Sequence, residues 1–490
     1  MNYIAFDLGG SGGKLFLGRY DGERLALLDV HRFENNPISI HNGLYWDIFN
    51  IYKQLNTGVK KAAELAEGPI ISMGLDTFSN DFAFIDKNGE VLTPLRCYRD
   101  IRTEKYKNAV YAKMSPDMLY AQSGNQIAPF NTLMQLAAMQ ESGQGYILEK
   151  AYKMLFTPDL LIHFLTGVAA SEYTIASVSQ MFDYNQNTWN EEIIKTFNIP
   201  RQILGDIVKP GTILGETQST YNKELNISGF KLVSVCEHDT ASAFLASISN
   251  GDKAIISSGT WSLVGTEVKQ PIINAMGYKY NIANEGGVKG RHRLIRNVMG
   301  LWIIQELRNY YNNHGAQYSF EDMEMTASQA KPFAYRIDPD DLIFFSPEDM
   351  PLKISQKCLE IDGKAPQTMG ETVRCAAESL AFKYRWAIEK IEQLVGKQLP
   401  IINLIGGGSK DKLICQFTAN ACNKPVLAGL SNATALGNIV VQLMADRQIA
   451  SIEQGQELIQ RSFPFSQYHP CDAELWNEKY GEFKAIFHLD

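Results

Sequence analysis

The chain is 490 residues long, 45% hydrophobic and 20% charged, with a formal net charge of −8. This length exceeds the size at which a single hydrophobic core stops growing, so we expect two domains. The acidic balance lacks the basic surface that nucleic acids and anionic membranes require, so we expect neither as a partner.

The seven cysteines are dispersed and include no C-x-x-C pair. An odd, scattered set predicts buried free thiols in a reducing compartment rather than a disulfide framework. The opening residues, MNYIAFDLGG, lack the order of a secretory signal peptide, and no apolar run approaches membrane-spanning length. We therefore expect a cytoplasmic protein.

The first half of the chain begins with strands and continues with helices. The apolar runs and turn residues predict strands at 3–7, 14–20, 25–33 and 69–75, a hairpin at 81–92, and a helix over 48–63. From about 131 to 196 the pattern predicts helices, with clear examples in NTLMQLAAMQ and TPDLLIHFLTG. The run KLVSVCEHD then predicts a strand that leads directly into the helix TASAFLAS.

The second half repeats the opening pattern of strand, small-residue turn and strand in KAIISSGTWSLVGTEV. A helix is predicted over 368–395, followed by alternating strands and helices in PIINLIGGGSKDKLICQFTANAC and PVLAG…ATALGNIVVQLM. The sequence therefore predicts two α/β domains with a boundary near residue 245, at 1–245 and 246–490.

Two glycine-rich turns, FDLGGSGGK at 6–14 and SSGTWSLVG at 257–265, stand at the start of these domains. Small residues let backbone N–H groups point at an anion, which favours a phosphate site. Equally, a tight hairpin uses glycine for positive φ, and from either turn alone this simpler interpretation is favoured. The occurrence of one turn in each domain strengthens the phosphate hypothesis.

Asp7 ends the first strand beside its glycines. A carboxylate next to a phosphate needs a bridging cation, so Asp7 is a candidate for a Mg²⁺ held mostly through waters. The alternative is an aspartate that caps its own turn. Asp239 begins the predicted helix TASAFLAS, and its local sequence alone favours a helix N-cap.

The chain resembles the FGGY carbohydrate kinases, and within them the rhamnulokinases. The motifs that carry the resemblance run in order from residue 4 to about 445: FDLGGSGGK, GLDT…DFAFID, YRDIRT, FNTLMQL, EHDTASA, SSGTWSL, NEGG, RNVMGLW, LIGGGSKDKL and LSNATALGNI. HDTASA, SGTWSL and NVMGLW are specific to this group, whereas the glycine runs also occur in other ATPases.

The resemblance implies an α/β fold with two actin-like (ribonuclease H-like) domains of the sugar kinase/chaperone/actin superfamily, separated by a central cleft. It implies ATP and Mg²⁺ as cofactors, with Mg²⁺ near Asp7. It also places the catalytic base, the aspartate of the H-D-T motif, on Asp239. Such a base must accept the proton of a sugar hydroxyl that attacks the γ-phosphate.

Further site residues follow from the resemblance motif by motif. The substrate contacts are His238 and Thr240 beside the base, Asn297 in NVMGLW, and Ser79. The nucleotide contacts are Gly10, Ser11, Gly12, Gly13, Lys14, Thr260, Gln305 and Gly407.

The segment Thr77-Phe78-Ser79-Asn80-Asp81 departs from the T-W-G-V-D or T-W-A-V-D of rhamnulokinases. Ser79 and Asn80 therefore add polar groups where the sugar would lie, and this can change which ketose is preferred. Lys14 replaces an arginine of the family pattern, which keeps the charge and loses the bidentate fork.

The implied reaction is ATP-dependent phosphorylation of the 1-hydroxyl of a 6-deoxy-L-ketohexose, with L-rhamnulose as the first choice. L-fuculose, or another ketose or polyol such as xylulose, is the alternative within the family. A different class, an actin-like or chaperone-like ATPase, would not need the H-D-T aspartate. We expect the sugar and ATP as the ligands, and a monomer or homodimer.

Overall fold

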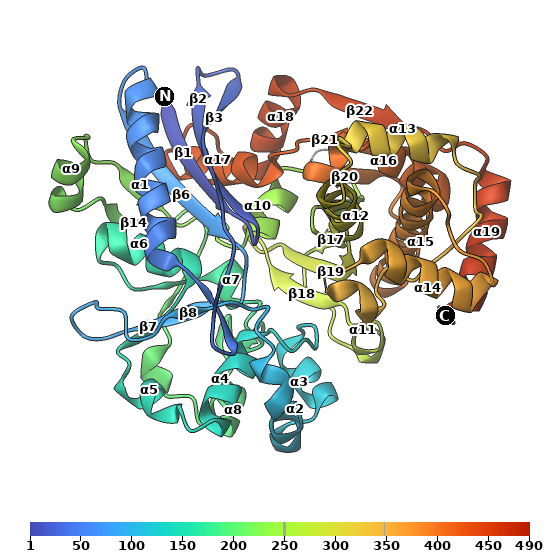
Figure 1. Ribbon diagram of the computed structural model, residues 1–490. Helices are drawn as coiled ribbons and strands as arrows, with labels where there is room; N and C mark the ends of the chain where they lie inside the picture. Colours follow the sequence, from blue (N-terminus) through green and yellow to red (C-terminus); the bar gives the residue numbers. More distant parts are fainter. Residues whose placement is uncertain (248–250, 347) are drawn as a thin grey trace. The chain divides into compact units, whose positions relative to one another are not determined.

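The computed structural model describes residues 1–247, 251–346 and 348–490. They form two compact units (Figure 1). Unit 1 comprises Met1–Ala246, Glu267–Leu294 and Ala433–Ser462, and unit 2 comprises Ser247–Thr266, Ile295–Asn432 and Phe463–Asp490. Each unit is therefore assembled from three separate stretches of the chain, and residues after 432 return to the unit that contains the N-terminus.

A six-stranded sheet in the order β14-β15-β6-β1-β2-β3 forms the centre of unit 1. The strands β1, β6 and β15 run parallel, and the others pair antiparallel at the edges. Their bounds are β1 Asn2–Leu8, β2 Gly12–Tyr20, β3 Leu25–Glu34, β6 Ile70–Thr77, β14 Ile213–Glu216 and β15 Lys231–Val233. The strands predicted at 3–7, 14–20, 25–33 and 69–75 are thereby confirmed.

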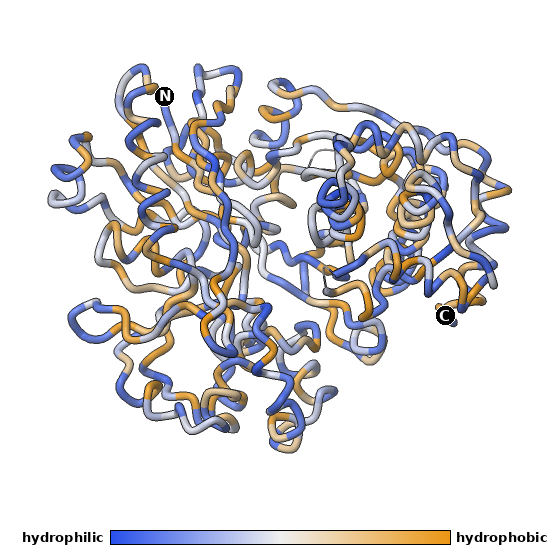
Figure 2. The backbone as a smooth tube through the Cα atoms, viewed as in Figure 1, coloured by the Kyte–Doolittle hydropathy of each residue, from blue (hydrophilic) through white to orange (hydrophobic). Residues whose placement is uncertain are grey.

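Helices cover both faces of this sheet. On one face α1 (Ile48–Leu65) and α6 (Thr157–Thr166) enclose the main core, to which β1 contributes Ile4, Phe6 and Leu8. Hydrophobic and hydrophilic residues alternate along α1, as its amphipathic sequence requires (Figure 2). On the other face α17 (Ala433–Ala445) packs against β1 and β6, and against α10 (Asp239–Leu245).

The remainder of unit 1 consists of short elements. Its strands are β4 Ile38–Ile40, β5 Gly43–Trp46, β7 Phe82–Ile85, β8 Leu95–Arg96, β9 Lys153–Phe156, β10 Ser171–Glu172, β11 Phe182–Asp183, β12 Thr188–Trp189, β13 Ile207–Val208 and β18 Ala283–Gly286. Its helices are α2 Arg102–Lys113, α3 Pro116–Ser123, α4 Thr132–Glu141, α5 Gly145–Lys150, α7 Tyr173–Ala176, α8 Glu191–Thr196, η1 Arg201–Ile203, α9 Ser219–Leu225, α11 Ala275–Lys279 and α18 Ile452–Ser462.

Of two further secondary-structure predictions in this unit, one was wrong and one is confirmed in part. The stretch 131–196 is not uniformly helical, because β9 to β12 interrupt it with strands of two to four residues. The hairpin predicted at 81–92 is present in a short form: the antiparallel bridge Ile85–Val91 and the backbone hydrogen bonds from Leu92 N to Phe84 O and from Asp86 N to Glu90 O close it, while β7 also pairs with β9.

Unit 2 contains a sheet segment in the order β17-β16-β20-β21-β22, with β16, β20 and β21 parallel. The bounds are β16 Ala254–Ser258, β17 Trp261–Val268, β20 Ile402–Ile405, β21 Val426–Gly429 and β22 Phe465–Tyr468. The strand β19 (His292–Met299) begins in unit 1 and ends in unit 2.

The longest helix among the described residues is α15 (Met369–Val395) of unit 2. It confirms the helix predicted over 368–395. Thr368 and Glu371 form a capping box at its start, and Gly396 ends it with positive φ. The others are α12 Trp302–Asn313, α13 Phe320–Gln329, η2 Leu342–Phe345, α14 Met350–Asp362, η3 Gly407–Lys410, α16 Lys412–Cys422 and α19 Ala473–Ile486.

All seven cysteines are free thiols, and six of them are buried as predicted, whereas Cys471 is exposed. Among the described residues, no helix combines the length and the apolar character needed to cross a membrane.

Candidate active site

Three aspartates lie on the α17 face of the unit 1 sheet. Asp7 on β1 is in direct register with Asp76 on the parallel strand β6. Thr77, the next residue of β6, forms a bridge with His238, which immediately precedes Asp239. Because these strands are parallel, Asp7, Asp76 and Asp239 lie together at the carboxyl ends of the strands. Ligands of open α/β sheets usually bind at this end.

Burial and mutual repulsion make these carboxyls harder to ionise. Burial, and then the charge of Asp239, raises the pKa of Asp7 to about 6, although Lys14 and Arg32 on the neighbouring strands oppose the shift. Burial, followed by the charge of Asp7, raises the pKa of Asp76 well above its usual value. Burial also raises the pKa of Asp239, and His238 partly offsets this.

Asp239 does not cap its helix. The N-cap of α10 is His238, and Asp239 is the first helical residue. Its Oδ1 accepts hydrogen bonds from Thr240, at 2.6 Å from the backbone N and 3.2 Å from Oγ1. The side chain remains 30% exposed. The N-cap interpretation of Asp239 was therefore wrong, and its carboxylate is available to a ligand.

The backbone that carries His238 and Asp239 is held by Glu172 and Thr174. The Glu172 carboxylate accepts from the backbone N of Glu237 at 3.2 Å, and Thr174 Oγ1 accepts from the backbone N of His238 at 3.2 Å. Thr174 Oγ1 in turn donates to Glu172 at 2.6 Å. All of these residues are buried, so this hydrogen-bonded group fixes the path of the chain into Asp239.

The partners of His238 were not predicted from the sequence. Its ring lies between Asp239 and a buried ion pair, Glu285 on β18 and Arg293 on β19. Glu285 lies in the motif NEGG, which contributed to the family resemblance without an assigned role. A glutamate and an arginine eight residues apart were the available signal for an ion pair. Their contact with His238 depends on the fold, so the sequence does not predict it.

The first glycine turn lies between β1 and β2, with Gly10 and Ser11 in the turn and Gly12, Gly13 and Lys14 at the start of β2. None of these glycines has positive φ, so hairpin geometry is not the reason for them. Space is the reason: a Cβ on Gly10 would lie 2.8 Å from the Tyr98 hydroxyl, and one on Gly13 would lie 2.2 Å from the ring of Phe33.

The second glycine turn, in unit 2, brings three predicted nucleotide residues together. Thr260 Oγ1 lies 3.5 Å from Gln305 Oε1 on α12. The glycines 406–408 pack beneath the same turn, because Cβ atoms on Gly406 and Gly408 would lie 2.8 and 2.2 Å from Ser258. Gly407, between them, is exposed and has nearly open space around it.

The segment 78–81, where the sequence departs from the family pattern, follows β6 in unit 1. Ser79 is half-buried, and its hydroxyl accepts from Asn80 Nδ2 at 3.1 Å. Asn80 has φ of 77°, a conformation that asparagine adopts more readily than a β-branched residue. Asp81 accepts from Trp46 at 2.7 Å and from the backbone N of Tyr98 at 2.9 Å, and burial raises its pKa to about 7.

The predicted substrate residues are divided between the units. Ser79, His238 and Thr240 belong to unit 1, whereas Asn297, half-buried on β19, belongs to unit 2. Within the described chain, no three histidine, cysteine or acidic side chains are arranged to enclose a metal ion.

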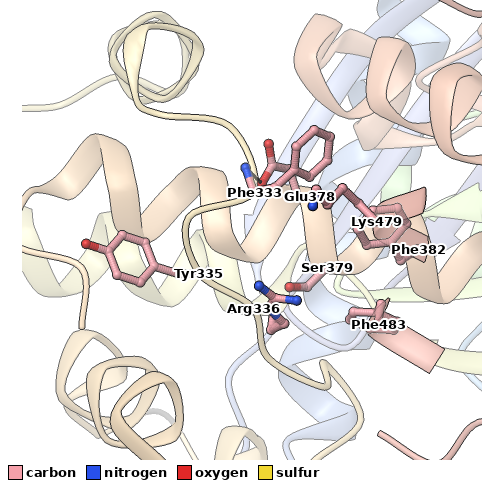
Figure 3. A pocket seen from close by; sticks show the side chains of 8 residues that line it. All are labelled: Phe333, Tyr335, Arg336, Glu378, Ser379, Phe382, Lys479 and Phe483. Carbon is pink, nitrogen blue, oxygen red and sulfur yellow. Dashed lines mark hydrogen bonds between the residues drawn. The ribbon is translucent and has the colours of Figure 1, made fainter. Parts of the chain in front are cut away.

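A small cavity in unit 2 is not part of this site. It is lined by side chains of α15, α19 and the chain near Phe333, as Figure 3 shows. Its volume is about 10 Å³. That is close to the least that one water molecule requires, so the cavity is a packing feature.

Comparison with known proteins places the whole chain in one family. Residues 2–246 match the N-terminal domain, and residues 254–445 the C-terminal domain, of the FGGY family of carbohydrate kinases. The chain is 36% identical over 485 residues to a rhamnulokinase of Bacteroides thetaiotaomicron, covering 99% of each chain. It is 37% identical to a rhamnulokinase of Oceanobacillus iheyensis, covering 96% of this chain and 99% of the other.

Solved structures share the fold at lower identity. A ligand-bound xylulose kinase from Lactobacillus acidophilus superposes with a TM-score of 0.83 at 16% identity, over 99% of this chain and 98% of the other. A Plasmodium falciparum glycerol kinase with ADP gives a TM-score of 0.79 at 16% identity, over 100% and 98%. The expected two-domain α/β fold is confirmed, and the chain belongs to the FGGY family of carbohydrate kinases.

Proposed function

We propose that this carbohydrate kinase transfers the γ-phosphoryl group of ATP to the 1-hydroxyl of a 6-deoxy-L-ketohexose, with L-rhamnulose as the preferred substrate. Relatives at 32–37% identity that carry the name rhamnulokinase support this sugar. L-fuculose and xylulose are the competing sugars, because the segment 78–81 differs from the rhamnulokinase pattern.

The observation that carries the proposal is the position of Asp239. Its carboxylate is half-exposed at the end of a rigidly held loop and is not used to cap its helix. In the reaction the sugar O1 attacks the γ-phosphorus, the bond from that phosphorus to the β,γ-bridging oxygen breaks, and ADP leaves. Asp239 accepts the proton of O1, and burial raises its pKa and so makes it a better base than a fully solvated aspartate.

ATP use follows from the family, and we assign its contacts within each unit. In unit 1 the turn Gly10–Ser11–Gly12–Gly13–Lys14 offers backbone N–H groups and one ammonium group. In unit 2 the turn between β16 and β17 is neutral and contains Thr260, and Gln305 and Gly407 lie around it. Neutral donors and glycine backbone suit phosphate oxygens because they bring no repelling charge.

The carboxylate of Asp7 suits Mg²⁺, since it is half-buried beside Asp239 and next to the phosphate-binding turn. A bound Mg²⁺ would neutralise charge that develops on the phosphates. Asp7 would hold it through waters, and Lys14, opposite Asp7 on β2, would add a second positive charge.

Sugar selection is assigned to Ser79, His238 and Thr240 of unit 1 and to Asn297 of unit 2. A polar group that is buried against the sugar without a matching hydroxyl costs about 1–3 kcal/mol, which is enough to discriminate epimers. We further propose a cytoplasmic location, because the free thiols suit a reducing compartment, and a monomeric or homodimeric state.

The test is ADP release measured with L-rhamnulose, L-fuculose, L- and D-xylulose, L-ribulose and glycerol. We expect the highest kcat/KM with L-rhamnulose and strict dependence on Mg²⁺. Activity with another sugar alone would correct the substrate, and activity with none of them would contradict the proposal. ATP hydrolysis at full rate without sugar would instead favour an actin-like or chaperone-like ATPase.

A further inference from the structure

We infer that Glu285 and Arg293 are positioning residues for Asp239 and act on it through the imidazole of His238. The inference rests on the proposed function, in which Asp239 is the base. It assigns the tautomer of the His238 ring and the carboxylate oxygen that receives the substrate proton.

The His238 ring has a carboxylate at each nitrogen. Nδ1 lies 3.4 Å from Glu285 Oε2, and Nε2 lies 3.5 Å from Asp239 Oδ1. The histidine side chain is only 7% exposed and that of Glu285 only 3%. The ring therefore connects a fully buried carboxylate to the half-exposed carboxylate of the base.

Arg293 fixes the buried end of this arrangement. Its Nη2 lies 3.0 Å from Glu285 Oε2 and 3.3 Å from His238 Nδ1. Its Nε donates to the carbonyl oxygen of Gly286 at 2.9 Å, and its guanidinium lies over the ring of Phe244 on α10. With a side-chain exposure of 1%, Arg293 has little freedom to move, so Glu285 is held in place.

The donor and acceptor roles follow from chemistry. A guanidinium only donates and an ionised carboxylate only accepts. The charge of Arg293 lowers the pKa of Glu285 despite its burial, which keeps Glu285 ionised. Nδ1 of His238 accepts the hydrogen bond of Arg293 Nη2 at 3.3 Å, so the ring proton lies on Nε2, which faces Asp239 Oδ1 at 3.5 Å. Glu285 pairs with Arg293 and holds the guanidinium against Nδ1, which avoids a buried unpaired charge.

Other charged groups surround the base. Asp7 on β1 and Asp76 on β6 repel its negative charge, while Lys14 and Arg32 act on Asp7. Among the surrounding charged groups, His238 and then Arg293 lower the pKa of Asp239. His238 is therefore the neighbour that orients the base, and Glu285 holds the arginine that fixes the tautomer of His238.

All contacts of the Asp239 carboxylate go to one oxygen. Oδ1 receives the backbone N–H and the hydroxyl of Thr240 and faces Nε2 of His238. Within the described part of the chain, Oδ2 makes no such contact. Oδ2 is therefore the atom that accepts the proton of the sugar hydroxyl, while Oδ1 is used to orient the carboxylate.

The first test combines NMR of the ring nitrogens with kinetics on Glu285→Gln. In the wild-type protein we expect a single tautomer of His238, with the proton on Nε2 and none on Nδ1, seen in ¹⁵N-histidine spectra and assigned with His238→Gln. In Glu285→Gln the guanidinium of Arg293 loses its ion-pair partner, and we expect the signals of the other tautomer, with the proton on Nδ1, to appear. The kcat should fall by about tenfold or more, with the KM for ATP within about twofold, because one hydrogen bond to a charged group is weakened.

Two variants serve as controls. Glu267→Gln breaks another glutamate–arginine pair of unit 1, with Arg291 at 3.2 Å, which does not touch His238, so ring signals and kcat should stay unchanged. Glu285→Asp keeps the charge and should retain the tautomer with the proton on Nε2 and part of the activity, even if Glu285→Gln folds poorly. Equal losses in Glu267→Gln and Glu285→Gln, or unchanged ring signals in Glu285→Gln, would overturn the inference.

A double-mutant comparison isolates the route through the ring. In a His238→Gln background the change Glu285→Gln should lower kcat no further, because its effect passes through the imidazole. Additive losses would mean that Glu285 acts by another path. The ring spectra need no substrate, so they also separate failure of this inference from failure of the proposed reaction.

Discussion

The two glycine turns have similar sequences but different surroundings. The β1–β2 turn of unit 1 follows Asp7, whose neighbours include Asp76, Asp239, Lys14 and Arg32. The β16–β17 turn of unit 2 is built from Ser258, Gly259 and Thr260, with Gln305 and the glycines 406–408 around it. One turn lies among ionisable groups, and the other is built from neutral polar ones.

This difference suggests that one type of hairpin serves two purposes. Proton transfer needs a carboxylate whose pKa is raised, and unit 1 supplies several. Phosphate binding needs donors without negative charge, and the unit 2 turn supplies them. We therefore expect substitutions of the unit 1 carboxylates to affect chemistry and those at the unit 2 turn to affect nucleotide binding.

The largest expected effect is that of Asp239→Asn. The amide keeps the shape but cannot accept the sugar proton, so sugar-dependent ADP release should fall by about 10³-fold, within the range of general-base catalysis. Asp206→Asn, at an exposed carboxylate of the same unit, is the matched control and should leave kcat unchanged. A loss below about tenfold in Asp239→Asn would remove the base from the mechanism.

The next effect is that of Thr260→Ala at the unit 2 turn. Loss of the hydroxyl should raise the KM for ATP by about tenfold, the cost of one hydrogen bond to a charged ligand, with kcat changed much less. Thr260→Ser keeps the hydroxyl and should restore the KM. If Thr260→Ala lowered kcat as strongly as Asp239→Asn, the division between the two turns would be wrong.

Glycine-to-alanine changes compare the packing of the two turns. Gly13→Ala places a methyl group against the Phe33 ring and should lower the free energy of unfolding by about 1–3 kcal/mol. Gly259→Ala meets only Trp261 O at an ordinary 3.5 Å, so its cost should be below about 1 kcal/mol. Urea unfolding monitored by circular dichroism measures both values, and equal costs would contradict the packing described.

The buried carboxyls of unit 1 predict how stability depends on pH. Burial raises the pKa of Asp81 to about 7 and that of Glu172 to about 8, above their values in an unfolded chain. The folded state therefore binds protons that the unfolded state releases, and stability is lost as the pH rises through these values. We expect the unfolding temperature to fall between pH 6 and pH 8, and to fall less in Glu172→Gln. A rise over this interval would contradict the assignment.

The smallest effect is that of Ser79→Gly, which restores the small residue of the family pattern. Its hydroxyl already accepts from Asn80, so only part of its hydrogen-bonding capacity is open to a sugar. We expect the ratio of kcat/KM for L-rhamnulose to that for L-fuculose to change by about threefold, less than a full buried hydrogen bond. An unchanged ratio would assign the choice of sugar to other residues.

Local signals in the sequence predicted the elements with strong periodicity and caps. The helix α15 has its capping box and its terminal glycine, and α6 has Pro158 near its start and Gly167 with positive φ at its end. The strands β10 to β12 were missed because two-residue strands form through tertiary pairing and carry no alternating pattern.

The site was only partly predictable for the same reason. The resemblance located Asp239 and the glycine turns, because these lie in short continuous motifs. The pairing of His238 with Glu285 and Arg293 depends on a stretch, Glu267–Leu294, that returns to unit 1 after part of unit 2. Likewise, Asn438 reaches Asp76 at 2.6 Å from α17, across 362 positions of sequence.

The most direct test of the division of labour is calorimetric titration of ADP into Asp239→Asn and Thr260→Ala. We predict that Asp239→Asn binds ADP with the wild-type Kd, within about twofold, although its sugar kinase activity is lost, while Thr260→Ala binds about tenfold more weakly. Weak binding by Asp239→Asn together with wild-type binding by Thr260→Ala would contradict the assignment of Asp239 as the base and of Thr260 as a nucleotide contact.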